Sequence, residues 1–212
     1  MPLADWIRSK LHEYNIHSFY YFSHKDNLEN ILEYGILSQN EVNNLGIEFT
    51  TFAEESVQVR RDERFIQITD GNRYNLHDLV PLYLTPQTPT LYARRNIQSD
   101  IFFCEIQSFL ISDANINYVF SDGNAGSQAT KFYYSLNFLN EIAWDVIRAE
   151  MWVDFPDGRR KRNAEFLVHP KVPVDRIWRF VVNNIQLKNK LENQLNRYSI
   201  EKEVSVDQRF FF

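Results

Sequence analysis

Residues 162–168 read Arg-Asn-Ala-Glu-Phe-Leu-Val, and this stretch carries the strongest single signal in the chain. Core-forming residues surround one carboxylate, Glu165, in a pattern typical of a β-strand. Strand alternation places Glu165 on the same face as Asn163 and Leu167. A carboxylate in such a strand is costly unless it is paired or faces a cleft. The commoner alternative is an edge strand with the carboxylate in solvent.

Four consecutive cations at residues 159–162 directly precede this strand. Such a run usually forms a solvated loop because like charges repel. Its position beside Glu165 also fits a loop that contacts phosphates. A second cluster, residues 60–64, could form ion pairs along a helix or supply an arginine that binds a diphosphate with two hydrogen bonds. The pair Arg94–Arg95 could serve either purpose.

Histidine and cysteine chemistry is sparse. His24 lies where a helix is expected to begin, either as a surface residue or in a corner where backbone N–H groups bind an anion or an amide. No two histidines have the spacing of metal ligands, and the single Cys104 lies in an apolar strand. We therefore expect no metal site and a buried, unreactive thiol.

The whole chain predicts an α+β fold, with several strands outside any β-α-β rhythm. Helices are expected over residues 4–14, 136–148 and 185–196, and another is expected to begin near Ser23 and end at Gly35. Strands are expected over residues 16–22, 80–84, 101–107, 116–120, 164–169, 176–183 and 199–206. Residues 38–80 are polar, with a helix expected near 53–64 and a turn at Asp70–Gly71. Such a long irregular stretch is usually functional or mobile.

Composition narrows the class of protein. The 212 residues are 44% hydrophobic and 24% charged, which predicts one globular domain over residues 1–212. The net charge of -5 disfavours a broad nucleic-acid-binding surface but allows a local basic groove. No run of 18 apolar residues occurs, and MPLADWIRSK has no apolar secretory core, so we expect a cytoplasmic protein without membrane contact. The chain lacks the GxGxxG, GxxxxGK[ST], HExxH and GxSxG patterns, which disfavours Rossmann and P-loop enzymes.

Six segments, taken in order, resemble the DarT family of DNA ADP-ribosyltransferases, which are the toxins of bacterial toxin–antitoxin pairs. These segments lie at residues 22–35, 60–61, 76–92, 119–123, 144–149 and 162–168. No single string is specific, but chance rarely reproduces six in sequence with the glutamate last. Two departures stand out. Asn124 replaces a histidine that often follows the Asp-Gly pair in the family, and Tyr21 replaces the first histidine of a pair.

The resemblance implies an ADP-ribosyltransferase fold, in which two packed, curved sheets and flanking helices enclose a central cleft for the substrate NAD. It implies that Glu165 and Arg61 are catalytic, with Glu165 binding the ribose 2′-OH and stabilising an oxocarbenium-like transition state. The implied NAD-binding residues are Tyr21, Ser23, His24, Asn27, Leu28, Arg60 and Arg61. The implied DNA-binding residues are Arg94, Asn124, Arg148, Arg159, Arg160 and Arg162.

The implied acceptor is a base of single-stranded DNA, because duplex pairing blocks the base nitrogens. Thymine and guanine are both family acceptors. The implied partner is a macrodomain glycohydrolase antitoxin that removes the ADP-ribose, and the chain is expected to be a monomer. Two alternatives stay open. Asn124 motivates an enzyme that modifies RNA or protein or hydrolyses NAD, and the lost histidine motivates a non-catalytic module that binds nucleic acid or a partner.

Overall fold

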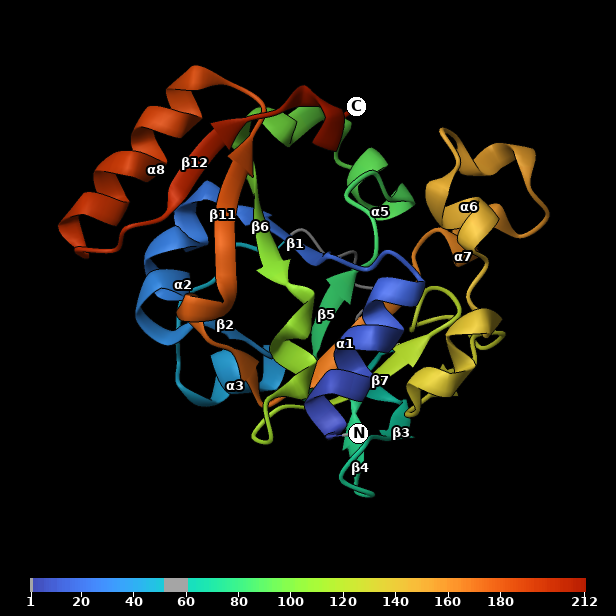
Figure 1. Cartoon of the computed structure of the whole chain (residues 1–212). Helices are drawn as coiled ribbons and strands as arrows, with labels where there is room; N and C mark the ends of the chain where they lie inside the picture. Colours follow the sequence, from blue (N-terminus) through green and yellow to red (C-terminus); the bar gives the residue numbers. More distant parts are fainter. Residues whose placement is uncertain (1, 52–60) are drawn as a thin grey trace.

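Eight strands of the computed structural model, which describes residues 2–51 and 61–212, form one mixed sheet (Figure 1). In spatial order they are β12 (Glu203–Val206), β11 (Ile177–Val182), β6 (Ile101–Gln107), β1 (Ser18–His24), β5 (Val80–Tyr83), β9 (Glu165–His169), β7 (Asn117–Ser121) and β8 (Phe132–Tyr133). Neighbours are antiparallel except β11 and β12, which are parallel.

The sheet has two halves that meet at β1 and β5. A single pair, Tyr20 opposite Tyr83, joins these strands, whereas β1 pairs with β6 along all of its residues from Ser18 to His24. The α+β class is therefore confirmed. The two sheets that the resemblance implies are four-stranded halves of one hydrogen-bonded sheet, which loses its regular pairing at the β1–β5 junction.

Two short ribbons and seven α-helices complete the described part of the chain. The ribbons pair β2 (Ile36–Leu37) with β10 (Lys171–Val172), and β3 (Phe65–Gln67) with β4 (Arg73–Asn75). The helices are α1 (Leu3–Glu13), α2 (Leu28–Tyr34), α3 (Gln39–Asn44), α5 (Pro89–Tyr92), α6 (Trp144–Arg148), α7 (Gly158–Lys161) and α8 (Ile185–Arg197). The 3-10 turns that bear on the argument are η1 (Lys25–Asn27), η5 (Leu136–Glu141) and η6 (Trp152–Asp154). No helix in these described residues is both long and apolar enough to cross a membrane.

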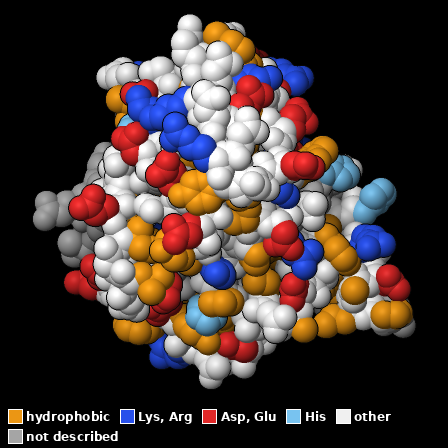
Figure 2. All heavy atoms as spheres, turned by 90° about the vertical axis from the view of Figure 1, so that its left-hand side faces the viewer, with side chains coloured by type: hydrophobic (Ala, Val, Ile, Leu, Met, Phe, Trp, Pro, Cys, Tyr) orange, Lys and Arg blue, Asp and Glu red, His pale blue; other side chains and the backbone are white. Residues whose placement is uncertain are grey.

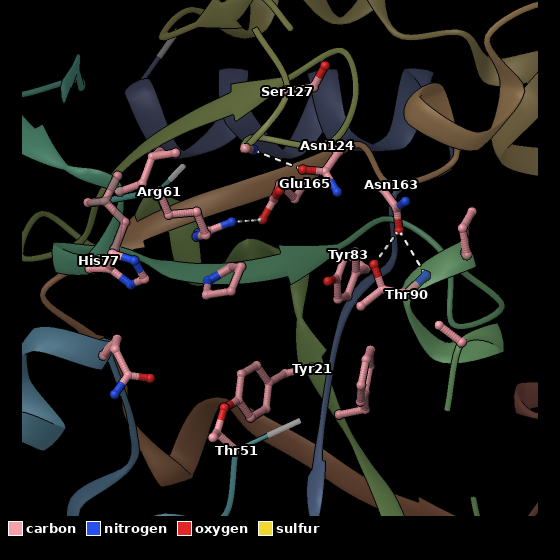
Figure 3. Close-up of a pocket in the computed structure, with 18 of the residues that line it drawn as sticks. Tyr21, Thr51, Arg61, His77, Tyr83, Thr90, Asn124, Ser127, Asn163 and Glu165 are labelled. Atoms are coloured by element: carbon pink, nitrogen blue, oxygen red, sulfur yellow. Dashed lines mark hydrogen bonds and ion pairs between the residues drawn. The ribbon is translucent and has the colours of Figure 1, made fainter. Parts of the chain in front are cut away.

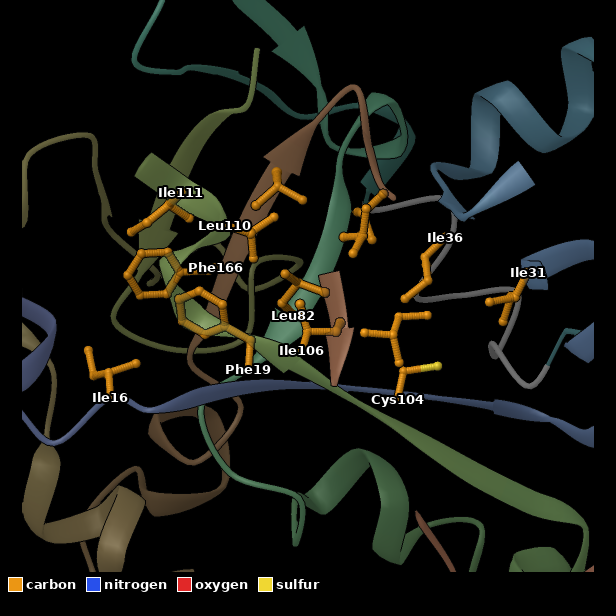
Figure 4. Close-up of a cluster of buried hydrophobic side chains, with 14 of the residues drawn as sticks. Ile16, Phe19, Ile31, Ile36, Leu82, Cys104, Ile106, Leu110, Ile111 and Phe166 are labelled. Carbon is orange, nitrogen blue, oxygen red and sulfur yellow. The ribbon is translucent and has the colours of Figure 1, made fainter. Parts of the chain in front are cut away.

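The main core brings the two halves of the sheet together (Figure 4). Phe19 of β1 packs on Phe166 of β9, with ring centroids 4.5 Å apart. Leu82 of β5 and Cys104 of β6 are fully buried in the same cluster. The buried thiol is confirmed, and burial raises the pKa of Cys104.

Alternation along β9 decides where its carboxylate points. Phe166 and Val168 enter the main core, whereas Leu167 enters a second cluster on the other face. β9 lies between β5 and β7, so the edge-strand alternative for Glu165 is wrong. The side chain is instead held inside the molecule, where it needs partners.

Several expected elements differ in detail. The helix expected over 136–148 is divided into η5 and α6, because Leu136, Leu139 and Ile142 are buried at a spacing of three, which suits a 3-10 turn. Ser23 does not begin a helix, because it is part of β1. His24 instead caps η1. The expected turn at Asp70–Gly71 connects β3 and β4. The helix expected near 53–64 falls mostly outside the described residues, and residues 61 and 62 are helical.

Candidate active site

A cleft of about 800 Å³ opens at the junction of the two half-sheets (Figure 3). A cavity of this size matches those that enclose small-molecule ligands. Its walls come from β1, β5, the start of β9, α5, α7 and the loop after β7. The polar and charged side chains that line it include Tyr21, Ser23, Arg61, His77, Tyr83, Thr90, Arg94, Asn124, Arg159, Arg160, Asn163 and Glu165.

Glu165 is the buried carboxylate of this cleft, with 2% of its surface exposed. Its Oε1 accepts the backbone N–H of Ala125 at 2.8 Å. Its Oε2 lies 3.6 Å from Nη1 of Arg61, an ion-pair distance, and has no hydrogen-bond donor in the described part of the chain. Figure 3 shows Arg61 and Glu165 pointing toward one another. One oxygen is therefore held by the backbone, and the other lies beside Arg61.

The charge state of Glu165 reflects two opposing effects. Burial raises the pKa of this carboxyl, and Arg61 and the Ala125 N–H act in the opposite direction. The net pKa is above the ordinary value for glutamate. A carboxylate whose pKa is raised in this way is a stronger base than an exposed carboxylate.

Tyr83 lies beside Glu165, because these two residues are opposite one another on β5 and β9. Burial, followed by the nearby charge of Glu165, raises the pKa of Tyr83 to about 12. The phenol is therefore protonated at neutral pH and can donate a hydrogen bond. The ring of Phe22 stacks on Tyr83 with centroids 5.7 Å apart, which closes this side of the cleft.

Asn163 and Thr90 form a second polar group at the cleft wall. Oδ1 of Asn163 accepts the Thr90 hydroxyl at 2.8 Å. The Asn163 amide also donates to the carbonyl of Arg159 at 3.0 Å. Alternation along the strand correctly placed Asn163 on the side of Glu165, but no sequence signal pointed to Thr90 or Tyr83 as neighbours.

His77 is a further polar residue of the cleft. Its Nε2 lies 3.3 Å from Oδ1 of Asp62, and the side chain is buried. The two residues are 15 positions apart, so no local spacing connects them. No group of three potential metal ligands occurs in residues 2–51 and 61–212, and the absence of a metal stays a prediction.

The structure separates the predicted site residues into two sets. Those that line the cleft are Tyr21, Ser23, Arg61, Arg94, Asn124, Arg159, Arg160 and Glu165. Those that do not are His24, Asn27, Leu28, Arg148 and Arg162. Arg60 lies outside the described residues.

Three of the predicted NAD-binding residues lie outside the lining of the cleft. Leu28 is fully buried in the main core. Asn27 is buried and ties two segments together, because its amide donates to Ser23 Oγ at 3.0 Å and to the Thr50 carbonyl at 2.8 Å. His24 caps η1, where its Nδ1 accepts the Asp26 N–H at 3.4 Å. Asn27 thereby supports Ser23, which lines the cleft.

Two of the predicted DNA-binding residues also lie outside this lining. Arg162 is 3% exposed and donates to the carbonyls of Gln87, Val146, Ile147 and Ala149. Arg148 lies in a separate, smaller pocket, donates to the carbonyl of Tyr14 and stacks over Trp144. Neither residue lines the cleft, and each guanidinium is bonded to backbone carbonyls elsewhere.

The cleft is large enough for a small-molecule ligand, and it holds a buried glutamate whose second oxygen lies unpaired beside an arginine. The chain belongs to the DarT family, since the model of that family, described as ssDNA thymidine ADP-ribosyltransferase, matches residues 20–212. The predicted family and enzyme class, an NAD-dependent DNA ADP-ribosyltransferase, are thereby confirmed.

Curated relatives agree with the family. A DNA ADP-ribosyl transferase of Thermus sp. (strain 2.9) is 30% identical over 161 residues, which cover 73% of this chain and 75% of the relative. A DNA ADP-ribosyl transferase-DNA ADP-ribosyl glycohydrolase fusion protein of Thermosipho africanus is 28% identical over 198 residues, covering 91% of this chain and 49% of the fusion.

Solved structures share the fold. Thermus sp. 2.9 DarT in complex with ADP-ribosylated ssDNA superposes with a TM-score of 0.85 at 24% identity, over 93% of this chain and 97% of that one. The same Thermus protein in complex with NAD+ superposes with a TM-score of 0.78 at 24% identity, over 93% and 98% of the two chains.

Proposed function

We propose that this chain transfers ADP-ribose from NAD to thymine in single-stranded DNA, with Glu165 as the catalytic carboxylate. The observation that carries the proposal is the buried Oε2 of Glu165, which lies in the cleft beside Arg61 without a hydrogen-bond donor in the described residues. A buried acceptor of this kind is unfavourable unless a ligand supplies the donor. The ribose 2′-OH of NAD is such a donor.

The chemistry follows from this placement. The bond between ribose C1′ and nicotinamide breaks, and positive charge develops on the ribose ring. The Glu165 carboxylate stabilises that charge, while nicotinamide leaves with the bonding electrons. N3 of thymine attacks C1′ and loses its proton, for which the raised pKa of Glu165 makes this carboxylate a suitable acceptor. N3 is engaged in the pairing of duplex DNA, so the acceptor strand must be single.

In this proposal, some of the cationic side chains that line the cleft bind NAD and others bind DNA. Arg61 lies next to Glu165 and holds the NAD diphosphate or the ribose end of NAD. Arg94 and Arg159 lie at the other wall, on and near α5 and α7, and contact the DNA backbone. Tyr21 and Ser23 face the nicotinamide end from β1. Asn124 lies near Glu165 in Figure 3, and in this proposal it contacts the acceptor base.

Intact-mass analysis is the first test. The purified protein is incubated with NAD and separate DNA oligonucleotides, with and without thymine, and with RNA. We expect a gain of one ADP-ribosyl group on thymine-containing DNA, accompanied by released nicotinamide. Transfer only to RNA would overturn the DNA assignment. Nicotinamide release with no oligonucleotide product would favour NAD hydrolysis or a protein acceptor, and neither product would favour a non-catalytic binding module.

The substitution Glu165→Gln tests the role of the carboxylate. The amide preserves the shape of the side chain but removes its charge, so we expect a loss of transfer of about 10²-fold to 10³-fold or more, while NAD still raises the melting temperature. The readouts are initial rates and thermal shift on the same preparation. A fully active variant would contradict the mechanism.

The cellular role follows from the family. We propose that the chain acts in the cytoplasm as the toxin of a toxin–antitoxin pair, as a monomer built from one domain over residues 1–212. Its proposed partner is a macrodomain protein with glycohydrolase activity. The Thermosipho relative, in which a transferase and a glycohydrolase are fused, supports this pairing.

A further inference from the structure

The loop at residues 122–130, here called the anchor loop, carries the only backbone N–H that is seen to bond the Glu165 carboxylate in the described residues, that of Ala125. The loop begins directly after β7, where the Ser121 hydroxyl accepts the backbone N–H of Glu165 at 3.2 Å. The same hydroxyl donates to the Gly123 carbonyl at 2.6 Å. The position of the carboxylate therefore depends on where this loop is held.

Arg160 holds one side of the anchor loop. Its Nη1 donates to Asp122 Oδ1 at 2.7 Å and to Thr130 Oγ1 at 3.1 Å, which joins the two ends of the loop. The Arg160 carbonyl also accepts the Asn124 N–H at 2.9 Å. The packing at this point is tight, because a Cβ added to Gly123 would lie 2.5 Å from Nη1 of Arg160.

Arg64 holds the same loop from its other side. Its guanidinium donates to the carbonyl of Ala125 at 2.9 Å, to that of Thr130 at 2.7 Å and also to that of Ser127. It lies over the ring of Phe132, 4.6 Å from the centroid. The carbonyl and the N–H of Ala125 are thus bonded to Arg64 and Glu165 respectively, which restricts the orientation of this residue.

We propose that Arg160 and Arg64 are positioning residues, which hold the anchor loop so that it orients Glu165 for transfer. This inference rests on the proposed function of Glu165. It assigns a different role to Arg160 from the DNA contact that the sequence pattern suggested. Each basic cluster then supplies one arginine that holds the anchor loop, Arg64 or Arg160, and Arg160 does so from the lining of the cleft.

The bonding of Arg160 distinguishes positioning from DNA contact. Its Nε donates to Asp157 at 2.6 Å while Nη1 is bound to Asp122, and its side chain is 13% exposed. A phosphate that approached Arg160 would meet these two carboxylates, which repel it. Arg159 is exposed, lines the cleft and has no carboxylate partner within the described residues, so it is the matched control.

Steady-state kinetics of Arg160→Met and Arg159→Met separate the two roles. We expect Arg160→Met to lower kcat by about 10-fold to 100-fold with little change in the KM for DNA, because small displacements of a catalytic group have effects of this size. Arg159→Met is expected to raise the KM for DNA and leave kcat nearly unchanged. If Arg160→Met raises only the KM for DNA, Arg160 is a DNA contact and the proposal is wrong.

The substitution Asp122→Asn also separates the two roles of Arg160, because positioning predicts impaired transfer and DNA contact predicts tighter use of DNA. It weakens the hold of Arg160 on the anchor loop, so positioning predicts a lower kcat. A DNA-contacting Arg160 would instead be released from an acidic competitor, and the KM for DNA would fall. Arg160→Lys, which keeps one charge for Asp122, should recover part of the lost kcat.

Amide hydrogen exchange tests the inference without catalysis. Peptides that contain Ala125 should exchange faster in Arg160→Met and in Arg64→Met than in the wild type, and Arg159→Met should not change them. Thermal unfolding of the same samples checks that each variant is folded. Unchanged exchange in both variants would overturn the positioning role. If the wild type fails to modify DNA, the proposed function fails, and the exchange result still decides whether the two arginines hold the loop.

Discussion

At the level of a single residue, the buried carboxylate of Glu165 is unfavourable for folding, although the proposed transfer reaction requires it. Its carboxylate is buried beside Arg61 and keeps one oxygen without a hydrogen-bond donor among the described residues. Burial raises its pKa in the folded protein above the ordinary value. Ionisation at neutral pH therefore destabilises the fold, and we attribute the retention of this charge to its role in transfer.

The pH dependence of stability follows with a definite sign. A folded-state pKa above that of the unfolded chain means that wild-type stability falls as pH rises from the ordinary glutamate range through the raised pKa of Glu165. Glu165→Gln removes this effect, so its melting temperature should exceed that of the wild type at pH 7. The difference should shrink toward pH 4.

Scanning calorimetry across pH 4–8 measures this difference, with Glu201→Gln as the control, since Glu201 is exposed. The control should follow the wild type at every pH. A Glu165→Gln variant that is less stable than the wild type at pH 7 would show that the ion pair with Arg61 outweighs the burial of the carboxylate.

Arg162 is a structural residue within a cationic run, and its removal should be costly. Arg162→Met leaves the carbonyls of Gln87 and of the C-terminal end of α6 without their donor, so we expect the free energy of unfolding to fall by about 2–4 kcal/mol. Arg159→Met should change it by less than about 0.5 kcal/mol. Urea unfolding measures both. Equal stabilities, with weaker DNA binding in Arg162→Met, would restore the DNA-binding role.

At the scale of elements, local signals identified the strands more reliably than the connections. The strand expected over residues 101–107 matches β6, and the one expected over 80–84 matches β5 within one residue. Apolar runs bounded by turn residues are local features, so they are visible in the sequence. The division of residues 136–148 was not visible, because a spacing of three fits both an α-helix and a 3-10 turn.

Gly35 ends α2 as expected, and its backbone conformation and close neighbours both disfavour any side chain at this position. Its φ is +82°, and an added Cβ would lie 2.5 Å from the carbonyl oxygen of Val172 on β10. Gly35→Ala should therefore lower the free energy of unfolding by at least about 2 kcal/mol, from strain and displaced backbone. Chemical denaturation measures the loss.

Gly46 is the matched control for this substitution. Its φ is +64°, but an added Cβ would meet nothing within 4 Å. Gly46→Ala should therefore show backbone strain alone, about 1 kcal/mol. Equal losses at the two positions would mean that the contact between α2 and β10 relaxes and that the close approach is unimportant.

The distribution of charge over the whole molecule determines where it can bind DNA. The net charge is -5, and the face that carries α2, α3 and α8 mixes cationic and acidic side chains (Figure 2). Within the described residues, many arginines are already paired or bonded to backbone, as Arg160 and Arg162 are. DNA binding should therefore be local to the cleft.

Salt dependence measures how many cations act on DNA. If Arg94 and Arg159 each neutralise one phosphate, the logarithm of the binding constant should fall with the logarithm of salt concentration with a slope of about -1.4, at about -0.7 per contact. Arg159→Met should reduce the slope in magnitude by about 0.7. Fluorescence anisotropy with a labelled single strand gives both slopes. A slope several times steeper would indicate a broad cationic surface.

The sequence by itself determined the α+β class, most strands, the family and the identity of Glu165 as the central carboxylate. These follow from local periodicity and from the order of short motifs along the chain, which need no knowledge of packing. It also indicated that Asn163 accompanies Glu165, since alternate residues of a strand share a face.

Only the tertiary structure decided which arginines reach the cleft. Residues 159, 160 and 162 are chemically alike in the sequence. In the structure Arg159 lines the cleft, Arg160 lines it while bonded to the anchor loop, and Arg162 lies among buried carbonyls. The physical reason is that a guanidinium binds whichever acceptors surround it, and the acceptors here, Asp122 and the carbonyls of Gln87 and Val146, come from distant parts of the chain. The neighbours that decide the role of each arginine come together only when the chain folds.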